Sequence, residues 1–466
     1  MQKLFKHQEE GITWLKKRKK ALLADDMGIG KTRQAIIATG ESTDKGSNNI
    51  LVICPASMKI TWEREIHEVY PGDEVEIIGE TNPRKPVWYV VNYDQLKKHE
   101  LYIIGLKPKS VILDEAHYIK GSSIRAKFSI KICEEAERVY LLTGTPIMNR
   151  PIELYNLLRA MSHSLVDSGW ISYIIRYCNA FQRTNKYSGR TFWDTSGASN
   201  IPELRENIKD IFLRREKKDV LDLPEKLISN VIVELGKSKE KGEDGKPINW
   251  KRNYEKAWDD YMEFLKQDPP ENLDNIIQAR HLVELQKLKQ VCSLAKIEQI
   301  VEDVESIMDS GEKVIIFTQY TKTLEAFKTR LRKFGTATLA GETSQENRQK
   351  AVDAFQTDPR IKIFIGNIKA AGVGITLTAA TKVIFADMEW TPALHAQAMD
   401  RAHRIGQNQT LNVYFYIAKD TLEEDIVELL KAKEALIQSL MSGDSTKRTK
   451  DHGVAHELLI RHKKHV

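Results

Sequence analysis

A short segment near the start of the chain, Gly28–Thr32 (GIGKT), has the residue types and the spacing of a loop that binds phosphate. It follows the apolar residues Ala21–Ala24 and precedes the helical pattern Arg33–Thr39, so we expect a strand, a loop and a helix. Glycines let backbone N–H groups close around phosphate oxygens, and the helix N-terminus adds positive potential. We expect Lys31 to bind the outer phosphates of a nucleotide and the Thr32 hydroxyl to bind Mg²⁺.

A second segment, Asp114–His117 (DEAH), follows the apolar strand pattern Val111–Leu113. Ligands bind at the carboxyl ends of parallel strands, so Asp114 is placed to hold Mg²⁺ through water and Glu115 to orient the attacking water. Each segment alone has a structural explanation. GIGKT can be a glycine-rich turn, since Asp25 stands where the full phosphate-loop pattern has glycine, and a carboxylate pair can simply end a strand. Together, and in this order, the two segments predict a site that hydrolyses a nucleoside triphosphate.

Hydrolysis of a phosphate bond also needs positive charge on the transferring group. The segment Gln397–Gln407 (QAMDRAHRIGQ) offers Arg401 and Arg404, which are three apart on an expected helix and would share a face. We expect them on a different lobe from the phosphate loop, so that hydrolysis would require the lobes to close. The alternative is a surface arginine pair with Asp400.

These residues need a scaffold, and short apolar runs followed by helical patterns supply it. They predict strands at 49–54, 87–93, 110–114 and 138–142, and again at 313–317, 362–365, 382–386 and 411–417. Such alternation is typical of parallel sheets covered on both faces, so the predicted fold class is α/β with two lobes. We expect lobe 1 at residues 1–225, a helical insertion and linker at 226–290, lobe 2 at 291–445 and a basic tail at 446–466.

Composition limits the possible classes of protein. The 466 residues carry 71 Lys and Arg against 65 Asp and Glu, a net charge of +6, which permits a polyanionic partner without arguing for one. The four cysteines lie far apart, with no zinc or redox spacing. No signal-peptide core and no apolar stretch long enough for a membrane span is found. We therefore expect an intracellular protein, cytoplasmic or nucleoid-associated if its source is bacterial or phage.

With these segments in order, the chain resembles the Swi/Snf-like DNA translocases of helicase superfamily two over about residues 1–440. The resemblance rests on the two segments above, on Leu4–Leu15 (LFKHQEEGITWL) and on Gln397–Gln407 with its DRAHRIGQ sequence. Within the family, Arg176–Cys178, Ser196–Asn200 (SGASN) and Phe212–Val220 resemble the branch of annealing helicases. The resemblance implies two RecA-like lobes, each a parallel sheet flanked by helices.

The resemblance also implies roles for single residues. The nucleotide-binding set would be Gln8 as the adenine reader with Asp26, Met27, Gly28, Ile29, Gly30, Lys31, Thr32 and Arg33. The set that relays the nucleotide state to the DNA grip would be His117, Thr143, Thr145, Gly374 and Gln397. The DNA-contacting set would be Pro55, Ala56, Ser57, Trp62, Asn149 and Trp390, although Trp390 is equally explained as a packing residue.

The function implied is ATP-dependent movement along double-stranded or forked DNA without sequence specificity, so as to remodel or reanneal DNA or to displace bound protein. A strand-separating helicase is the first alternative. It would need a wedge such as an aromatic hairpin, which the sequence does not identify. A motor subunit of a restriction or defence complex is a second alternative, and an ATP-gated DNA clamp with little turnover is a third.

Overall fold

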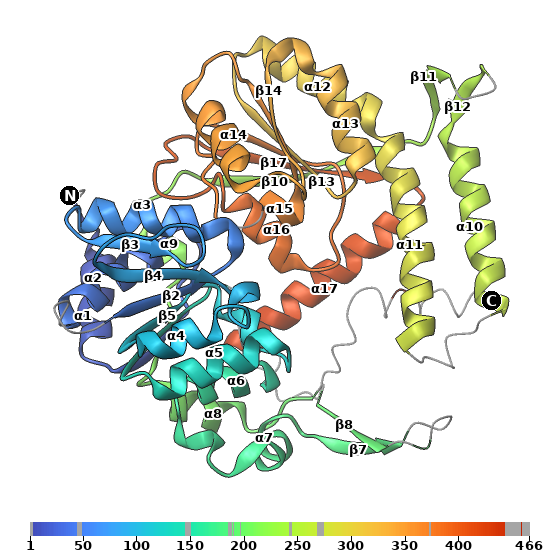
Figure 1. Cartoon of the computed structure of the whole chain (residues 1–466). Coiled ribbons are helices and arrows are strands. Elements are labelled where there is room, and N and C mark those ends of the chain that lie inside the picture. The colour runs from blue at the N-terminus through green and yellow to red at the C-terminus, as the bar shows by residue number, and fades with distance from the viewer. Residues whose placement is uncertain are drawn as a thin grey trace. The chain divides into compact units, whose positions relative to one another are not determined.

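The computed structural model describes residues 3–43, 49–144, 151–184, 189, 191–195, 197–241, 245–267, 275–371, 374–442 and 458. The chain forms two compact units, one built mainly from Met1–Asp222 and the other mainly from Leu223–Leu436. Each unit has its own parallel sheet flanked by helices, as Figure 1 shows. The predicted fold class is therefore confirmed.

The sheet of the first unit has seven parallel strands in the order β3-β4-β2-β5-β6-β1-β9. The strands are β1 Lys20–Leu23, β2 Ile50–Cys54, β3 Glu74–Ile77, β4 Pro86–Asn92, β5 Ser110–Leu113, β6 Arg138–Leu142 and β9 Phe212–Leu213. Successive side chains of a strand point to opposite faces. In β2, Leu51 and Ile53 join one core whereas Ile50 and Val52 join the other. Both faces are buried, which explains the continuous apolar runs.

Helices cover this sheet, and one of them begins at a side-chain cap. The helices are α1 Lys6–Lys16, α2 Lys31–Ser42, α3 Lys59–Val69, α4 Glu100–Leu106, α5 Ile124–Glu135, α6 Ile152–Ala160, α7 Gly169–Tyr177, α8 Ile201–Ile208 and α9 Lys217–Val220. Short 3₁₀ turns are η1 Ala56–Met58, η2 Tyr93–Gln95, η3 Ala116–Ile119 and η5 Ser164–Val166. Helix α5 begins after Ser123, whose hydroxyl accepts a hydrogen bond from the Ala126 N–H at 3.4 Å.

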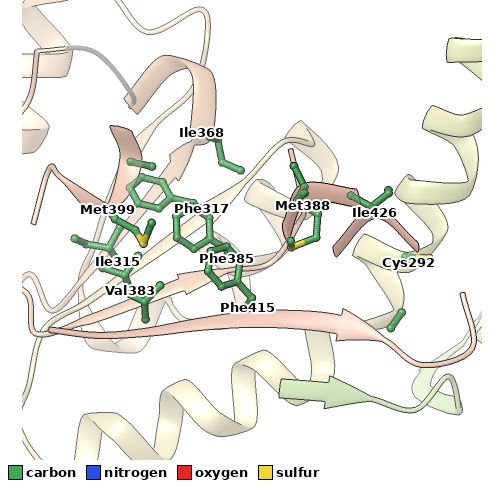
Figure 2. Close-up of a cluster of buried hydrophobic side chains, with 14 of the residues drawn as sticks. Cys292, Ile315, Phe317, Ile368, Val383, Phe385, Met388, Met399, Phe415 and Ile426 are labelled. Carbon is green, nitrogen blue, oxygen red and sulfur yellow. The ribbon is translucent and has the colours of Figure 1, made fainter. Parts of the chain in front are cut away.

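The sheet of the second unit has six parallel strands in the order β10-β17-β16-β13-β15-β14. The strands are β10 Lys226–Val233, β13 Val314–Thr318, β14 Thr336–Leu339, β15 Ile363–Asn367, β16 Lys382–Phe385 and β17 Leu411–Ala418. Figure 2 shows the core on one face, where the rings of Phe317, Phe385 and Phe415 meet. The opposite core contains Val314 and Ile316 from the same strand as Phe317.

The helices of this unit are α10 Trp250–Gln267, α11 Asn275–Ala295, α12 Ile297–Asp309, α13 Thr321–Arg330, α14 Gln345–Thr357, α15 Ile368–Ala371, α16 Pro392–Met399 and α17 Leu422–Ser442, with the 3₁₀ turn η7 Arg332–Phe334. Helices α10 and α11 lie in the expected helical insertion. The expectation is wrong for residues 226–249, which form β10 and the antiparallel pair β11 Lys237–Lys241 and β12 Pro247–Asn249. Strand β10 lies at the sheet edge with most residues exposed, so it lacks the buried pattern of the central strands.

A separate two-stranded hairpin extends from the first unit. Strand β7 (Phe181–Thr184) pairs antiparallel with β8 (Thr191–Asp194), and neither joins the main sheet. Figure 1 shows the hairpin projecting beyond α7 and α8. All four cysteines are buried and free. Within the described part of the chain, no helix is both long and apolar enough to cross a membrane.

Candidate nucleotide site

The phosphate loop connects β1 to α2 in the first unit, as the sequence predicts. Its two glycines, Gly28 and Gly30, have φ of 79° and 86°, a conformation that other residues rarely adopt. Gly30 also has no room for a side chain, because a Cβ there would collide with the Gln8 carboxamide. Lys31 donates to the backbone carbonyls of Asp25 at 2.7 Å and Asp26 at 3.0 Å. The lysine that is expected to bind phosphate therefore rests on the loop itself.

The start of α1 fixes the other side of the loop. The Gln8 carboxamide oxygen accepts from the Phe5 N–H at 3.1 Å, and its nitrogen donates to the Ile29 carbonyl at 3.4 Å. The Nε2 atom of His7 lies 2.9 Å from the same carbonyl. Gln8 is thus buried between the helix and the loop, and its role as adenine reader stays a prediction. Arg33, also expected at the nucleotide, pairs with Glu68 at 3.1 Å.

Two arginines that no sequence motif indicates, Arg214 and Arg215, hold the base of the loop. The Asp25 carboxylate is fully buried and accepts from the Arg215 backbone N–H at 2.9 Å and Nε at 3.1 Å, with an ion pair to Nη2. Asp26 pairs with Arg214 at 3.1 Å and accepts from the Lys217 N–H at 3.0 Å. Asp25 stands where the full phosphate-loop pattern has glycine, and here that position anchors the loop to the segment that follows β9.

The carboxylates of the DEAH segment lie at the end of β5. Asp114 accepts from the Trp62 indole N–H at 2.8 Å and from the Glu115 N–H at 2.9 Å. Burial and the Glu115 carboxylate raise the pKa of Asp114 to about 6, while the Trp62 hydrogen bond and Lys31 act in the opposite direction. The pKa of Lys31 is lowered by burial and raised again by Glu115, Asp25, Asp114 and Asp26, so lysine and carboxylates share one electrostatic environment.

Glu115 has a backbone conformation that is unusual for a non-glycine residue, with φ of 50° and ψ of 52°. Such strain is kept where the surrounding structure imposes it, and often at functional sites. One Glu115 carboxylate oxygen lies 3.2 Å from His117 Nδ1. The rings of Tyr93 and Tyr118 stack with their centres 5.2 Å apart, and the Tyr93 hydroxyl donates to the Asp114 carbonyl at 2.8 Å. The segment is therefore held at both of its acidic residues.

The donor set suits a magnesium ion better than a transition metal. Asp114 offers carboxylate oxygens and Thr32, next to Lys31 at the start of α2, offers a hydroxyl, and Mg²⁺ prefers oxygen ligands completed by water and phosphate. No group of three or more His, Cys, Asp or Glu side chains that could hold a metal occurs among the described residues. An ion here would depend on the nucleotide for further ligands.

The expected DNA-contacting residues of the first unit divide into two groups. Pro55 is buried at the end of β2, whereas Ala56 is exposed and Ser57 partly exposed in η1. Trp62 is fully buried in α3 and its indole serves Asp114, so the prediction that it contacts DNA is wrong. Helical spacing explains the error, because Trp62, Ile66 and Val69 line the buried face of α3.

The expected coupling segment after β6 also reaches the phosphate loop. Thr143 is buried, and its N–H donates to the Leu23 carbonyl of β1 at 3.1 Å. A Cβ on Gly144 would collide with the Met27 side chain and lie 3.2 Å from Lys31 Nζ. The end of β6 thus lies against the nucleotide loop. Thr145 and Asn149 fall outside the described residues.

The expected site residues of the second unit lie in and after α16. Gln397 is buried in the helix, but α16 ends at Met399, so Arg401 and Arg404 lie in successive turns rather than on a helix. Gln407 holds this non-helical segment, since its carboxamide donates to the carbonyls of Thr378, Ala380 and Ala402. The Arg401 carbonyl accepts from the Leu377 N–H at 2.8 Å in the same arrangement.

Two further expected residues belong to this unit. Gly374 has φ of 76°, which a glycine adopts readily. Trp390 is partly buried against the core, and Lys289 Nζ lies 4.1 Å from the centre of its ring. These contacts favour the packing explanation of Trp390 over the DNA-contacting one.

Two family models match the chain. Residues 7–242 match the SNF2-related domain, and residues 295–406 match the helicase conserved C-terminal domain. A solved structure of similar sequence is the Sulfolobus solfataricus SWI2/SNF2 ATPase core in complex with double-stranded DNA. It is 26% identical, with a TM-score of 0.43 over 95% of this chain and 94% of that one.

Relatives of similar sequence are longer proteins. The chain is 31% identical to a Caenorhabditis elegans homolog of the SWI/SNF-related matrix-associated actin-dependent regulator of chromatin subfamily A-like protein 1, over 97% of this chain and 64% of the relative. It is 31% identical to the human DNA annealing helicase and endonuclease ZRANB3, over 97% of this chain and 41% of the relative. It is 29% identical to an uncharacterized ATP-dependent helicase of Mycoplasma genitalium, over 95% of this chain and 42% of the relative. The chain thus spans less than two thirds of the length of each.

Proposed function

We propose, from the premise that this chain belongs to the SNF2-related ATPases of the helicase type, that it uses ATP hydrolysis to move along double-stranded DNA. The family resemblance predicted from the motifs is confirmed by the two matching family models. The observation that carries the ATP-hydrolysing part of the proposal is the shared environment of Lys31, Asp114 and Glu115, which joins a phosphate loop to a carboxylate pair in the first unit. Relatives named as annealing helicases support DNA remodelling or reannealing as the outcome of that movement.

The proposed chemistry assigns each residue a task. Lys31 leaves the carbonyls of Asp25 and Asp26 and binds the outer phosphates of ATP, while the N–H groups at the start of α2 hold their oxygens. Glu115 orients the attacking water. Bound Mg²⁺, held by Thr32 and Asp114, would neutralise charge on the phosphates. Trp62 and the Glu115 N–H keep the Asp114 carboxylate in one orientation. We propose that Arg401 and Arg404 stabilise the charge that develops as the bond breaks.

On the DNA side, we propose contacts to the phosphate backbone rather than to base edges. Ala56 and Ser57 are the accessible members of the expected set in the first unit, and their 3₁₀ turn offers backbone groups at the end of β2. Contacts of this kind carry no sequence information and weaken as salt rises. We propose His117, Thr143 and Gln397 as the residues that relay the state of the nucleotide, since His117 lies 3.2 Å from the Glu115 carboxylate.

The experiment that tests this function measures ATP turnover without nucleic acid and with single-stranded, blunt duplex and forked DNA. We expect strong stimulation by duplex, no release of strands from a tailed duplex, and loss of turnover in Glu115→Gln. Arg404→Ala should reduce turnover while leaving ATP binding in place. Stimulation by single strands alone, or separation of a tailed duplex, would refute translocation and favour a strand-separating helicase. Turnover that no DNA changes would favour the clamp or a motor that needs a partner chain.

A further inference from the structure

The hairpin β7–β8 presents one aromatic and basic face. Antiparallel pairing places Arg183 opposite Phe192 and Phe181 opposite Asp194, so these four side chains share a face. Phe181 is 45% exposed and Phe192 is 51% exposed. The Arg183 guanidinium lies 5.2 Å from the centre of the Phe181 ring and pairs with Asp194 at 3.0 Å. Two open rings thus lie beside a positive charge that a neighbouring carboxylate holds in position.

The opposite face of the hairpin is anchored. Trp193 packs against a core of the first unit, as does Ala180, which precedes β7. The hydroxyls of Thr184 and Thr191 meet at 3.4 Å on the same side as Trp193. Packing of the anchored face against the core accounts for the stability of the hairpin. The exposed rings of Phe181 and Phe192 add little to that packing, so their position on the open face calls for another explanation.

The base of the hairpin is closed by hydrogen bonds between its two flanks. Ser199 Oγ donates to the Arg176 carbonyl at 2.5 Å, and Asn200 Nδ2 donates to the same carbonyl at 2.8 Å. The Arg176 guanidinium grips Glu203 of α8 at 2.8 and 2.7 Å. A Cβ on Gly197 would lie 2.8 Å from the Cys178 carbonyl, so only glycine allows the flanks to approach this closely. The open face therefore has a fixed direction on the first unit.

We propose that the open face, defined by Phe181, Arg183 and Phe192, binds unpaired bases of DNA by stacking. Aromatic rings beside arginine are a stacking platform for bases, and stacking is tolerant of sequence. Residues 181–194 contain three basic residues and one acidic residue, which complements a polyanion. Bases inside a duplex are already stacked on each other, so only single strands, branch points and duplex ends offer open base faces.

This inference rests on the proposed DNA substrate but not on movement along it. The test uses the full chain and measures affinity for a labelled oligothymidylate strand and for a blunt duplex. The variant Phe181→Ala/Phe192→Ala removes both rings, and Phe181→Tyr/Phe192→Tyr keeps them. The matched control Thr184→Ala/Thr191→Ala changes the opposite face of the same strands. A 2-aminopurine base in the single strand reports stacking directly, because its fluorescence is quenched when it stacks.

We expect the double alanine variant to bind the single strand at least about fivefold more weakly than the unmodified chain. Its blunt-duplex affinity and its duplex-stimulated ATP turnover should be unchanged. The tyrosine variant and the threonine control should bind the single strand normally. Arg183→Ala, which keeps both rings, should weaken single-strand binding to a lesser extent. The inference is overturned if the alanine variant keeps its single-strand affinity and its 2-aminopurine quenching, or if it loses duplex and single-strand affinity equally. Failure of the proposed translocation would appear separately, as an unmodified chain whose ATP turnover duplex DNA does not stimulate.

Discussion

Replacing Arg215 with alanine tests whether the segment after β9 holds the phosphate loop. Arg215 contacts Asp25 through its backbone N–H, its Nε and its Nη2, and it also donates to Gln34 at 2.8 Å. The Asp25 side chain is fully buried and that of Arg215 is 13% exposed. The substitution removes the guanidinium, so that among the described residues the backbone N–H of residue 215 remains as the hydrogen-bond donor to the buried Asp25 carboxylate.

Breaking a buried ion pair by removing one partner destabilises a protein by about 3–5 kcal/mol. Arg215 keeps some exposure, and Asp25 keeps the hydrogen bond from the backbone N–H of residue 215. We therefore expect the free energy of unfolding to fall by about 3 kcal/mol, the lower end of this range. Arg215→Lys keeps the charge but not the planar guanidinium, so its free energy of unfolding should lie between those of the unmodified chain and Arg215→Ala. The KM for ATP should rise in both variants, because Asp25 and Asp26 carry the carbonyls on which Lys31 rests.

The assay is urea unfolding of the full chain, with hydrogen exchange in peptides from β1 and β9 to assign the transition to the first unit. Lys19→Ala is the control, since it breaks an ion pair to Glu137 whose side chains are 70% and 59% exposed, and such pairs contribute little. If the free energy of unfolding of Arg215→Ala falls by less than about 1 kcal/mol, the buried Asp25 carboxylate does not depend on the Arg215 guanidinium, and the reasoning is refuted. An unchanged KM for ATP would refute the link between the Arg215–Asp25 ion pair and the phosphate loop.

Three other predictions concern Trp62, the pair of Lys296 and Glu423, and Lys289. Trp62→Phe removes the hydrogen bond to Asp114, so the Mg²⁺ concentration for half-maximal turnover should rise about tenfold or more, whereas duplex affinity should not change. Lys296→Met should destabilise the second unit by about 3–5 kcal/mol, because it leaves the buried Glu423 carboxylate without its partner at 2.6 Å. Adding Glu423→Leu to Lys296→Met should restore most of the loss measured by urea unfolding. Burial lowers the pKa of Lys289 to about 8, so the unfolded chain binds more protons between that pH and 10.5 and stability rises there. Lys289→Met should remove this rise, and its stability relative to the unmodified chain should therefore fall from pH 7 to pH 10.

The parts of the fold that the sequence predicts are those encoded by neighbouring residues. The central strands of both sheets appear where continuous apolar runs place them, because burial on both faces leaves a signal in every residue of the run. The phosphate loop and the DEAH segment are equally local, since each lies within a few residues of its strand. Edge strand β10 has most of its residues exposed, so burial leaves no comparable pattern there.

The parts that the sequence does not predict depend on tertiary contacts or on side-chain direction. Asp25 and Arg215 are 190 residues apart, and nothing in either segment alone identifies the partner. Trp62 lies in a segment assigned to DNA, but its place on the buried face of α3 directs it to Asp114. The hairpin left only a weak sequence signal, because Phe181–Thr184 and Thr191–Asp194 flank a Ser-Gly turn pattern but do not alternate regularly between apolar and polar residues.

The Arg215 contact also has a topological consequence for a motor. Strand β9 pairs with β1, and the backbone hydrogen bonds continue past the strand as the Asp26 N–H donates to the Arg215 carbonyl at 3.1 Å. The chain then passes through α9 and enters the second unit at Leu223. The segment that leaves the first unit is thus bonded to the base of the phosphate loop. The same residues, Asp25 and Asp26, thus belong to the phosphate loop and hold the segment through which the chain leaves the first unit.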